Sequence, residues 1–210
     1  AACALVRCGP ALELMEAEGS PVSEGLCGSD RLEGLPQGRV QGGGPTDHIR
    51  LVSLGCFCGA KLSFQSIGRG AEALPFDWIR IRACGLLHYL KTDFAGFFDF
   101  VTRLEIPDSK LTVYRDFLHS FWHDNPTDPA AQEKYRRRIE RFNRIRADEQ
   151  PVLFVRSIAS TDEIADTEEL LTALLERHGQ HARLLLIIDF QELLQGPATV
   201  EGHGGLLIYF

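Results

Sequence analysis

Two apolar runs in the second half of the chain limit its fold most strongly. "VLFVR" follows Pro151 and "ARLLLIID" ends at Asp189, and both have the composition of buried strands. Between them, "ADTEELLTALLERHG" has the period of an amphipathic helix that ends at Gly179. A strand, a helix and a second strand at this spacing indicate a crossover between parallel strands. The sequence therefore predicts a three-layer α/β fold with a partly parallel sheet.

The segment from His48 adds another strand and helix. In "HIRLVSLG" the apolar residues alternate and then run together, which predicts a buried strand over residues 52–54 that stops at Gly55. "CGAKLSFQSI" has the spacing of a short amphipathic helix, and a longer helix is predicted from Ile79 to Leu90. "GLLIYF" predicts a last strand, and the chain stops inside it. We therefore expect one α/β domain over residues 48–210, cut at its C-terminal end.

A further helix, from Glu133 to Arg146, has the clearest amphipathic pattern of the chain. Its apolar residues recur at helical spacing on one face, namely Tyr135, Ile139, Phe142 and Ile145. The arginines fall on the opposite face, where solvent explains them better than a bound polyanion.

The first 47 residues differ in character from the rest. They hold nine of the 20 glycines and show no sustained period of helix or strand. This composition predicts a flexible, disordered Gly/Pro-rich tail over residues 1–47.

Charge and cysteine content limit the possible partners. A formal net charge of −7 argues against nucleic-acid binding, which favours a basic surface. No apolar run approaches the roughly 18 residues that span a bilayer, so we expect a soluble protein without a membrane partner. The six cysteines lie in a chain long enough to fold without disulfides. Reduced thiols and a cytoplasmic location are the expectation, and no signal peptide can be read after Ala1.

The stretch "SLGCFCGAKL" places two thiols between a strand and a helix. A cysteine at a helix start meets unpaired backbone N–H groups and the positive end of the helix dipole, and both favour a thiolate. Cys58 lies at the helix start, whereas Cys56 is still in the turn. Gly55 and Gly59 would shape the turn and leave backbone N–H groups open to an oxyanion. The competing interpretation is that these cysteines are small core residues.

A thiolate nucleophile needs an imidazole partner, and "DFLHSFWHDNPTD" offers two histidines. His123 precedes a turn signature and is therefore expected at the end of an element, open to a site. His119 has apolar neighbours and reads equally well as a core residue. Of the other histidines, His178 is expected to make a favourable contact with a helix C-terminus.

The ordered set of motifs "SLGCFCGAKL", "PFDWI", "HD", "KYRRRIERF" and "VLFVR" resembles the papain-like cysteine peptidase family DUF1796 over roughly residues 50–190. The family cysteine falls three residues after the glycine of "SLG", on Cys58, and the family histidine falls on His123. The resemblance implies a papain-like fold and thiol chemistry. The expected substrate is an unidentified peptide, amide or thioester, with no cofactor.

No motif fixes a third catalytic member. Asp189 is a candidate because it follows a buried strand, and Asp77 is the alternative. Asp77 has a structural interpretation as well, as the cap of the helix predicted to begin near Ile79.

Three other functions remain open from the residues alone. The "SLGCFCG" turn could hold a phosphate in a nucleotide-sugar or phosphate-binding domain, although no complete glycine-rich fingerprint is present. The fold could serve a non-enzymatic interaction module. Cys56, Cys58, His119 and His123 have the donor types of a zinc site, but the two pairs are far apart in sequence, so no metal is expected.

Overall fold

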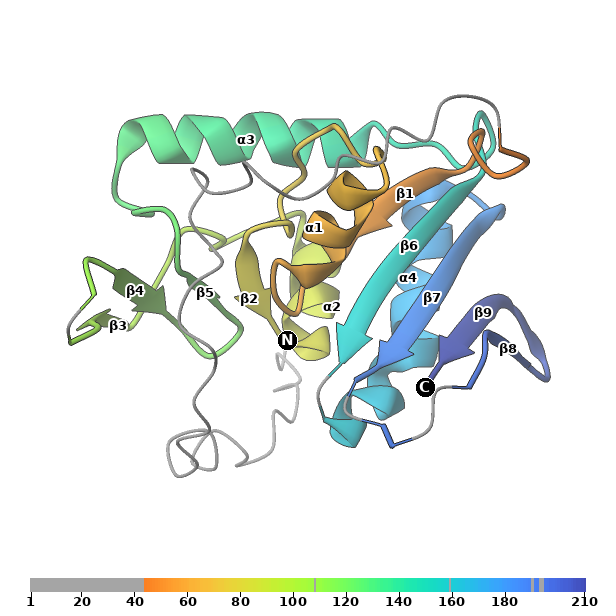
Figure 1. Cartoon of the computed structure of the whole chain (residues 1–210). Helices are drawn as coiled ribbons and strands as arrows, with labels where there is room; N and C mark the ends of the chain where they lie inside the picture. The colour runs from red at the N-terminus through yellow and green to blue at the C-terminus, as the bar shows by residue number, and fades with distance from the viewer. Residues whose placement is uncertain (1–43, 108, 159, 190, 193–194) are drawn as a thin grey trace, which may run out of the picture. The chain divides into compact units, whose positions relative to one another are not determined.

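A mixed five-stranded sheet forms the framework of the fold in this computed structural model (Figure 1). The structure describes residues 44–107, 109–158, 160–189, 191–192 and 195–210. Nearly all of the predicted tail over residues 1–47 therefore lies outside the described residues. The strands of the sheet, in spatial order, are β1 (Arg50–Ser53), β6 (Val152–Ile158), β7 (Ala182–Ile188), β9 (His203–Tyr209) and β8 (Ala198–Val200).

The first four strands of this order are parallel, and β8 pairs antiparallel at the edge. The predicted strands over 52–54, 152–155 and 184–188 correspond to β1, β6 and β7, which are neighbours in the sheet. The predicted α/β class with a partly parallel sheet is thus confirmed. The final run "GLLIYF" lies in β9, as expected.

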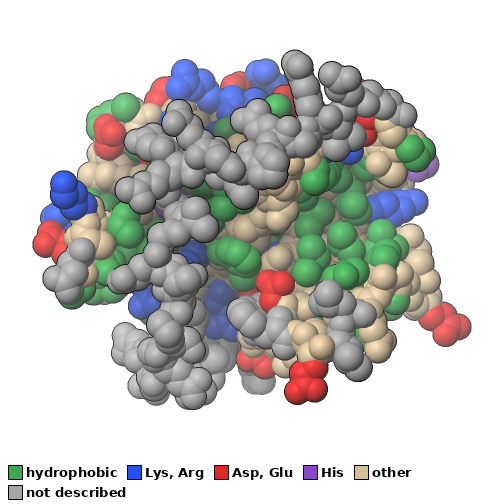
Figure 2. Space-filling model, in the orientation of Figure 1, with side chains coloured by type: hydrophobic (Ala, Val, Ile, Leu, Met, Phe, Trp, Pro, Cys, Tyr) green, Lys and Arg blue, Asp and Glu red, His purple; other side chains and the backbone are tan. Residues whose placement is uncertain are grey.

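Side chains alternate across the sheet and build a core on each face. Phe154 of β6 and Leu184 of β7 point into the larger core, which α2 (Ala83–Thr92) and α4 (Thr167–His178) cover. Val155 points to the opposite face, where α1 (Gly59–Ser66) contributes Ala60 and Phe64. Figure 2 shows hydrophobic side chains gathered on the sheet face that α1 covers. Because α1 packs on this face, its first turn lies close to the C-terminal end of β1.

A second, antiparallel sheet lies beside the first and was not predicted. Its strands, in spatial order, are β2 (Ile79–Ile81), β5 (His119–Phe121), β4 (Thr112–Arg115) and β3 (Thr102–Glu105). The helix expected from Ile79 to Leu90 is wrong at its start, because residues 79–81 pair with β5 and the helix begins at Ala83. The two sheets share one hydrophobic core.

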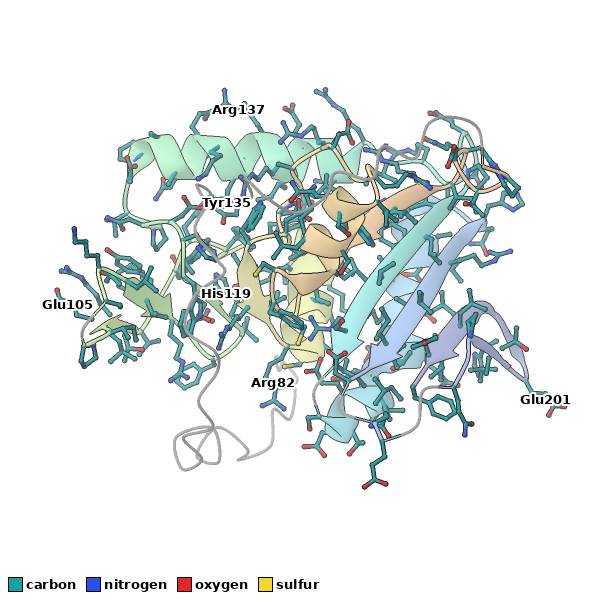
Figure 3. All side chains as sticks on the ribbon, in the orientation of Figure 1. Arg82, Glu105, His119, Tyr135, Arg137 and Glu201 are labelled. Carbon is teal, nitrogen blue, oxygen red and sulfur yellow. The ribbon has the colours of Figure 1, made fainter. Side chains whose placement is uncertain are left out.

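The arginine-rich segment forms α3 (Pro129–Asn143), the longest helix described. Asp128 caps its N-terminus by accepting a hydrogen bond from the Ala130 N–H at 3.0 Å, and Pro129 occupies the first turn. The predicted inward face is confirmed within the helix, because Tyr135 and Phe142 are buried and Ile139 packs partly against the core. The predicted end at Arg146 is wrong, because α3 ends at Asn143 and the buried Ile145 lies just after it. Figure 3 shows Tyr135 on the inner side of α3 and Arg137 on the outer side.

Replacing Phe142 with alanine should lower the free energy of unfolding by about 3 kcal/mol or more. The ring is fully buried and makes edge contacts with Phe76, Phe94 and His178, so truncation leaves a cavity. Arg137→Ala on the exposed face is the matched control and should change stability by less than about 0.5 kcal/mol. Urea unfolding measures both, and equal losses at the two positions would show that the face is assigned wrongly.

His178 lies in the core instead of making the expected charged contact with the helix end. Its side chain is fully buried, with its ring centroid 4.7 Å from that of Phe142 and 4.9 Å from that of Phe154. Nδ1–H donates to the Ile145 carbonyl at 3.2 Å. Burial lowers the pKa of His178 to about 4, because the protonated ring loses its hydration. The ring is therefore neutral at pH 7.

A depressed histidine pKa makes stability depend on pH with a definite sign. The unfolded chain binds a proton near the ordinary histidine value of about 6.5, whereas the folded protein binds it only near 4. The free energy of unfolding should thus fall by about 3 kcal/mol as the pH drops from 6.5 to 4. His178→Phe should remove this part of the slope, and His48→Gln, at an exposed position, should keep it. Identical slopes in the wild type and His178→Phe would contradict the assignment.

Candidate active site

The turn after β1 has a backbone conformation that restricts its residues. Gly55 has a φ of 75°, and a β-carbon there would lie 2.9 Å from Ile81 Cγ2 and 3.0 Å from the Phe76 carbonyl oxygen. Both observations require glycine. Cys56 follows with a φ of 84°, which is unusual for a residue with a side chain. The turn therefore stays folded because it packs tightly against residues 76–81.

Cys58 is the N-cap residue directly before α1, so it lies at the helix start that the sequence predicts. Its carbonyl accepts the Leu62 N–H at 3.0 Å, and its side chain is half-buried. The thiol thus lies where helix N–H groups point outward. Phe57, which is 41% exposed, lays its ring over Gly59, where an added β-carbon would be 2.2 Å from Cε2. An aromatic side chain therefore borders the helix start.

The Cys56 thiol lies in a different environment from that of Cys58. Burial raises the pKa of Cys56, and the carboxylates of Glu163 and Asp189 raise it further. The positive charges of Arg156 and Arg80 oppose this shift. The Cys56 thiol is consequently protonated at neutral pH, because even an ordinary thiol titrates above pH 8.

His123 follows β5 and reaches the surface, and its ring stands edge-on to Trp78 with centroids 6.0 Å apart. Partial burial of the ring lowers the pKa of His123, and the charges of Arg80 and Lys134 lower it too. The Asp124 carboxylate opposes the shift. The imidazole is therefore neutral at pH 7 and can accept a proton.

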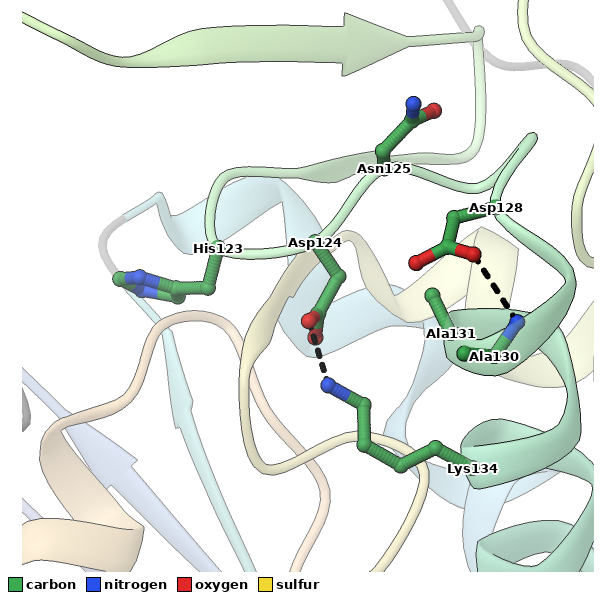
Figure 4. A pocket seen from close by; sticks show the side chains of 7 residues that line it. All are labelled: His123, Asp124, Asn125, Asp128, Ala130, Ala131 and Lys134. Carbon is green, nitrogen blue, oxygen red and sulfur yellow. Dashed lines mark hydrogen bonds and ion pairs between the residues drawn. The ribbon is translucent and has the colours of Figure 1, made fainter.

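An open cavity of about 370 Å³ lies between His123 and the first turns of α3 (Figure 4). On its wall, Asp124 forms an ion pair with Lys134 and accepts a hydrogen bond from the Tyr135 hydroxyl at 3.0 Å. The His123 ring points away from this ion pair in Figure 4. Asp124 thus anchors the loop that carries His123 and leaves the ring to other contacts.

Strand β2 connects the cysteine turn to the histidine segment. Gly55 packs against the carbonyl oxygens of residues 76 and 79 on one side. Trp78, directly before β2, contacts the His123 ring on the other. The charge of Arg80, in the middle of β2, acts on both Cys56 and His123. The predicted cysteine turn and the predicted histidine are therefore neighbours of the same short strand.

A buried ion pair holds the cysteine turn and strand β2 together. Arg156 of β6 is fully buried and donates to the Leu54 carbonyl at 3.2 Å and to the Ile81 carbonyl at 2.7 Å. It also pairs with Glu163 of the 3-10 helix η2 (Thr161–Asp166), and Glu163 accepts the Ala83 N–H at 2.9 Å. The end of β1, the end of β2 and the start of α2 are thus tied to one guanidinium group.

Asp77 belongs to a second buried ion pair. Its carboxylate lies 3.1 Å from Lys61 Nζ and accepts the Leu74 N–H at 2.8 Å. Burial raises the pKa of Asp77, while Lys61 opposes the shift. The expected helix cap is wrong, because residues 79–81 form a strand. Instead, Asp77 anchors α1 through Lys61, three residues after Cys58.

Asp189 follows β7 at the same end of the parallel strands as the cysteine turn. Burial raises the pKa of Asp189, and its charge acts on the Cys56 thiol. The carboxylate that acts on His123 is that of Asp124.

His119 makes a complete set of core contacts, as its apolar neighbours suggested. Nδ1 lies 2.9 Å from the Tyr89 hydroxyl and 3.0 Å from Asp116, and Nε2 lies 2.9 Å from the Phe97 carbonyl oxygen. Both ring nitrogens are therefore engaged within the core. Among the described residues, no cluster of three or more histidine, cysteine or acidic side chains could hold a metal ion.

The fold and site define an α/β protein in which a cysteine at a helix start and a histidine both lie near strand β2. A family model described as "Putative papain-like cysteine peptidase (DUF1796)" matches residues 49–192. The chain belongs to this family.

A curated relative, "Uncharacterized protein R408" of Acanthamoeba polyphaga mimivirus, is 24% identical over 168 residues, which cover 65% of this chain and 75% of that protein. No solved structure matches the chain. No helix in the described part of the chain is long and apolar enough to cross a membrane.

Several residues of the site were missed in the sequence. Arg156 ends the run "VLFVR" and reads as the solvated end of a strand, although an acidic residue seven positions later was available as a partner. Arg80 and Trp122 gave no signal, because the pairing of β2 with β5 joins residues about forty positions apart. Trp78 belongs to the motif "PFDWI", but the motif did not indicate its contact with His123.

Arg156→Ala should destabilise the protein by about 3–5 kcal/mol, because it leaves the Glu163 carboxylate buried without its ion pair. Arg183→Ala in the neighbouring strand β7 is the matched control. Arg183 donates only to nearby carbonyl groups and should cost less than about 1 kcal/mol. Chemical unfolding measures both variants, and a small loss for Arg156→Ala would show that the ion pair does not hold the site.

Proposed function

We propose that the protein is a cysteine-dependent hydrolase or acyltransferase that acts on an amide or thioester, with Cys58 as nucleophile and His123 as general base. The observation that carries the proposal is the packing of the cysteine turn and the His123 ring around the β2 strand segment. Membership of the family supports thiol chemistry. A neutral imidazole at pH 7 suits the role of proton acceptor.

The reaction would proceed in two steps. His123 takes the proton of the Cys58 thiol, and the sulfur attacks the carbonyl carbon while the carbonyl π electrons move to oxygen. Backbone N–H groups at the start of α1, from Gly59 onward, would stabilise this oxyanion. Gly55 shapes the turn and is less suited to this role, because its N–H already donates to the Ser53 hydroxyl oxygen at 3.2 Å. The C–N or C–S bond then breaks, and His123 donates its proton to the leaving group. Water or another acceptor releases the acyl group from Cys58 and regenerates the thiol.

Asp189 is the better candidate for a third member. It lies at the same end of the parallel sheet as the cysteine turn, and its carboxylate has no ion-pair partner among the described residues. Asp77 is less suited, because Lys61 and the Leu74 N–H already engage its carboxylate.

Alkylation by iodoacetamide tests the proposed nucleophile. At pH 7, Cys58 should react about tenfold faster than Cys56 or Cys84, because the thiolate is the reactive form and a helix start favours it. Cys56 has a raised pKa and Cys84 is buried, so both should react slowly. Mass spectrometry of time points assigns a rate to each cysteine.

His123→Ala should slow the alkylation of Cys58 about fivefold, because the thiol loses its proton acceptor. The control is His48→Ala, since His48 precedes β1 at the end opposite the turn. Cys56→Ala should leave the rate at Cys58 unchanged. A Cys58 that reacts no faster than Cys84, or that is indifferent to His123→Ala, would overturn the proposed function.

A further inference from the structure

We infer that Arg80 binds a carboxylate of the substrate beside the bond that Cys58 attacks. This inference rests on the proposed function and adds a substrate class to it. The substrates would be acyl compounds with a carboxylate next to the scissile bond, either on an acidic side chain or at a C-terminus. Three features of Arg80 carry the inference, namely its rigid support, its lack of an acidic partner and its position.

Arg80 is held by an aromatic platform. It is the exposed residue of β2, between the buried Ile79 and Ile81, so its side chain leaves the core. Its guanidinium carbon lies 4.0 Å from the ring centroid of Trp122. The Trp122 ring is in turn fixed, because Nε1–H donates to the hydroxyl of the buried Ser120 at 2.9 Å. Ser120 is the residue opposite Arg80 in the β2–β5 register.

No carboxylate lies within ion-pair distance of Arg80 among the residues that the structure describes. By contrast, Arg50, Arg144 and Arg177 of the same domain pair with acidic side chains. Stacking on Trp122 uses the face of the guanidinium and leaves the N–H groups in its plane. Those N–H groups match the two oxygens of a carboxylate. Arg80 is therefore preorganised for an anionic group from outside the domain.

The position of Arg80 joins it to the proposed reaction. Trp78, two residues earlier in the turn that leads into β2, contacts the His123 ring. The backbone carbonyl oxygens before Arg80 pack against Gly55 of the cysteine turn. A carboxylate bound to Arg80 would thus lie between the helix start that carries Cys58 and the base.

Binding at Arg80 should also change the proton affinity of His123. The charged groups that act on His123 are Asp124, Arg80 and Lys134, and the positive charge of Arg80 lowers its pKa. An anion on Arg80 cancels that charge and should raise the histidine pKa. By linkage, protonation of His123 should strengthen anion binding to the same extent.

Two reagents of similar size test the inference at Cys58. Iodoacetate carries a carboxylate and iodoacetamide does not, so the ratio of their alkylation rates reports attraction of the anion. Arg80→Gln should lower this ratio about three- to fivefold, as expected for one partly exposed ion pair. Arg80→Lys should lower it less, because the charge remains while the flat guanidinium is lost. Arg82→Gln, at the neighbouring arginine labelled in Figure 3, is the matched control and should leave the ratio unchanged.

Titration of His123 by NMR provides a readout that does not need a reactive thiol. The probes are three acetylated tripeptides: Ala-Asp-Ala amide, Ala-Asn-Ala amide and Ala-Ala-Ala with a free C-terminus. If Arg80 binds an acidic side chain, only the Ala-Asp-Ala amide should raise the His123 pKa. If it binds a C-terminal carboxylate, only Ala-Ala-Ala with the free C-terminus should raise it. Arg80→Gln should abolish either response.

The outcomes separate the two proposals. Slow alkylation of Cys58 by both reagents, with no effect of His123→Ala, would overturn the proposed function, and the titration would still decide whether Arg80 binds carboxylates. Fast alkylation with the same reagent ratio in the wild type and Arg80→Gln would overturn the assignment of Arg80 alone. A His123 pKa that none of the three peptides moves would overturn it as well.

Discussion

The buried ion pair between Arg156 and Glu163 is the interaction on which the rest of the site depends. A guanidinium removed from water needs partners for its charge and donors, and here three different segments supply acceptors to the two terminal nitrogens. Among the described residues, Nε has no acceptor. Because the acceptors include the carbonyl groups of Leu54 and Ile81, the parallel sheet and the antiparallel sheet are held at one point. That point adjoins the turn that carries Cys56 and Cys58, because Leu54 directly precedes the turn.

The surroundings of the turn explain how a strained backbone can persist there. Gly55 fits against β2 without room for a side chain, and Cys56 holds a positive φ that the neighbouring contacts must stabilise. On the far side of the turn, the buried Lys61–Asp77 pair secures α1. The turn is thus fixed at both ends by ionic groups, which holds its centre in one conformation.

Periodicity made the parallel strands and the helices α3 and α4 predictable from sequence, because long apolar patterns have only one consistent interpretation. It failed for β2, whose three residues are too few to show alternation before a helix of similar composition. It failed for β3 too, where all four residues are exposed. The placement of Cys58 at a helix start was predictable from "SLGCFCG". The burial of Arg156 was not, since only tertiary contacts distinguish a buried arginine from a solvated one.

The link between Arg156 and Leu54 spans 102 positions of the chain. During synthesis, the cysteine turn is therefore made long before the strand that supports it, and β1 must wait for β6, which is its one sheet neighbour within the described residues. Until then the segment is an unpaired apolar strand followed by two accessible thiols. The order of synthesis thus makes oxidation or misplaced pairing of this segment a hazard of the nascent chain, and it delays assembly of the site until most of the domain exists.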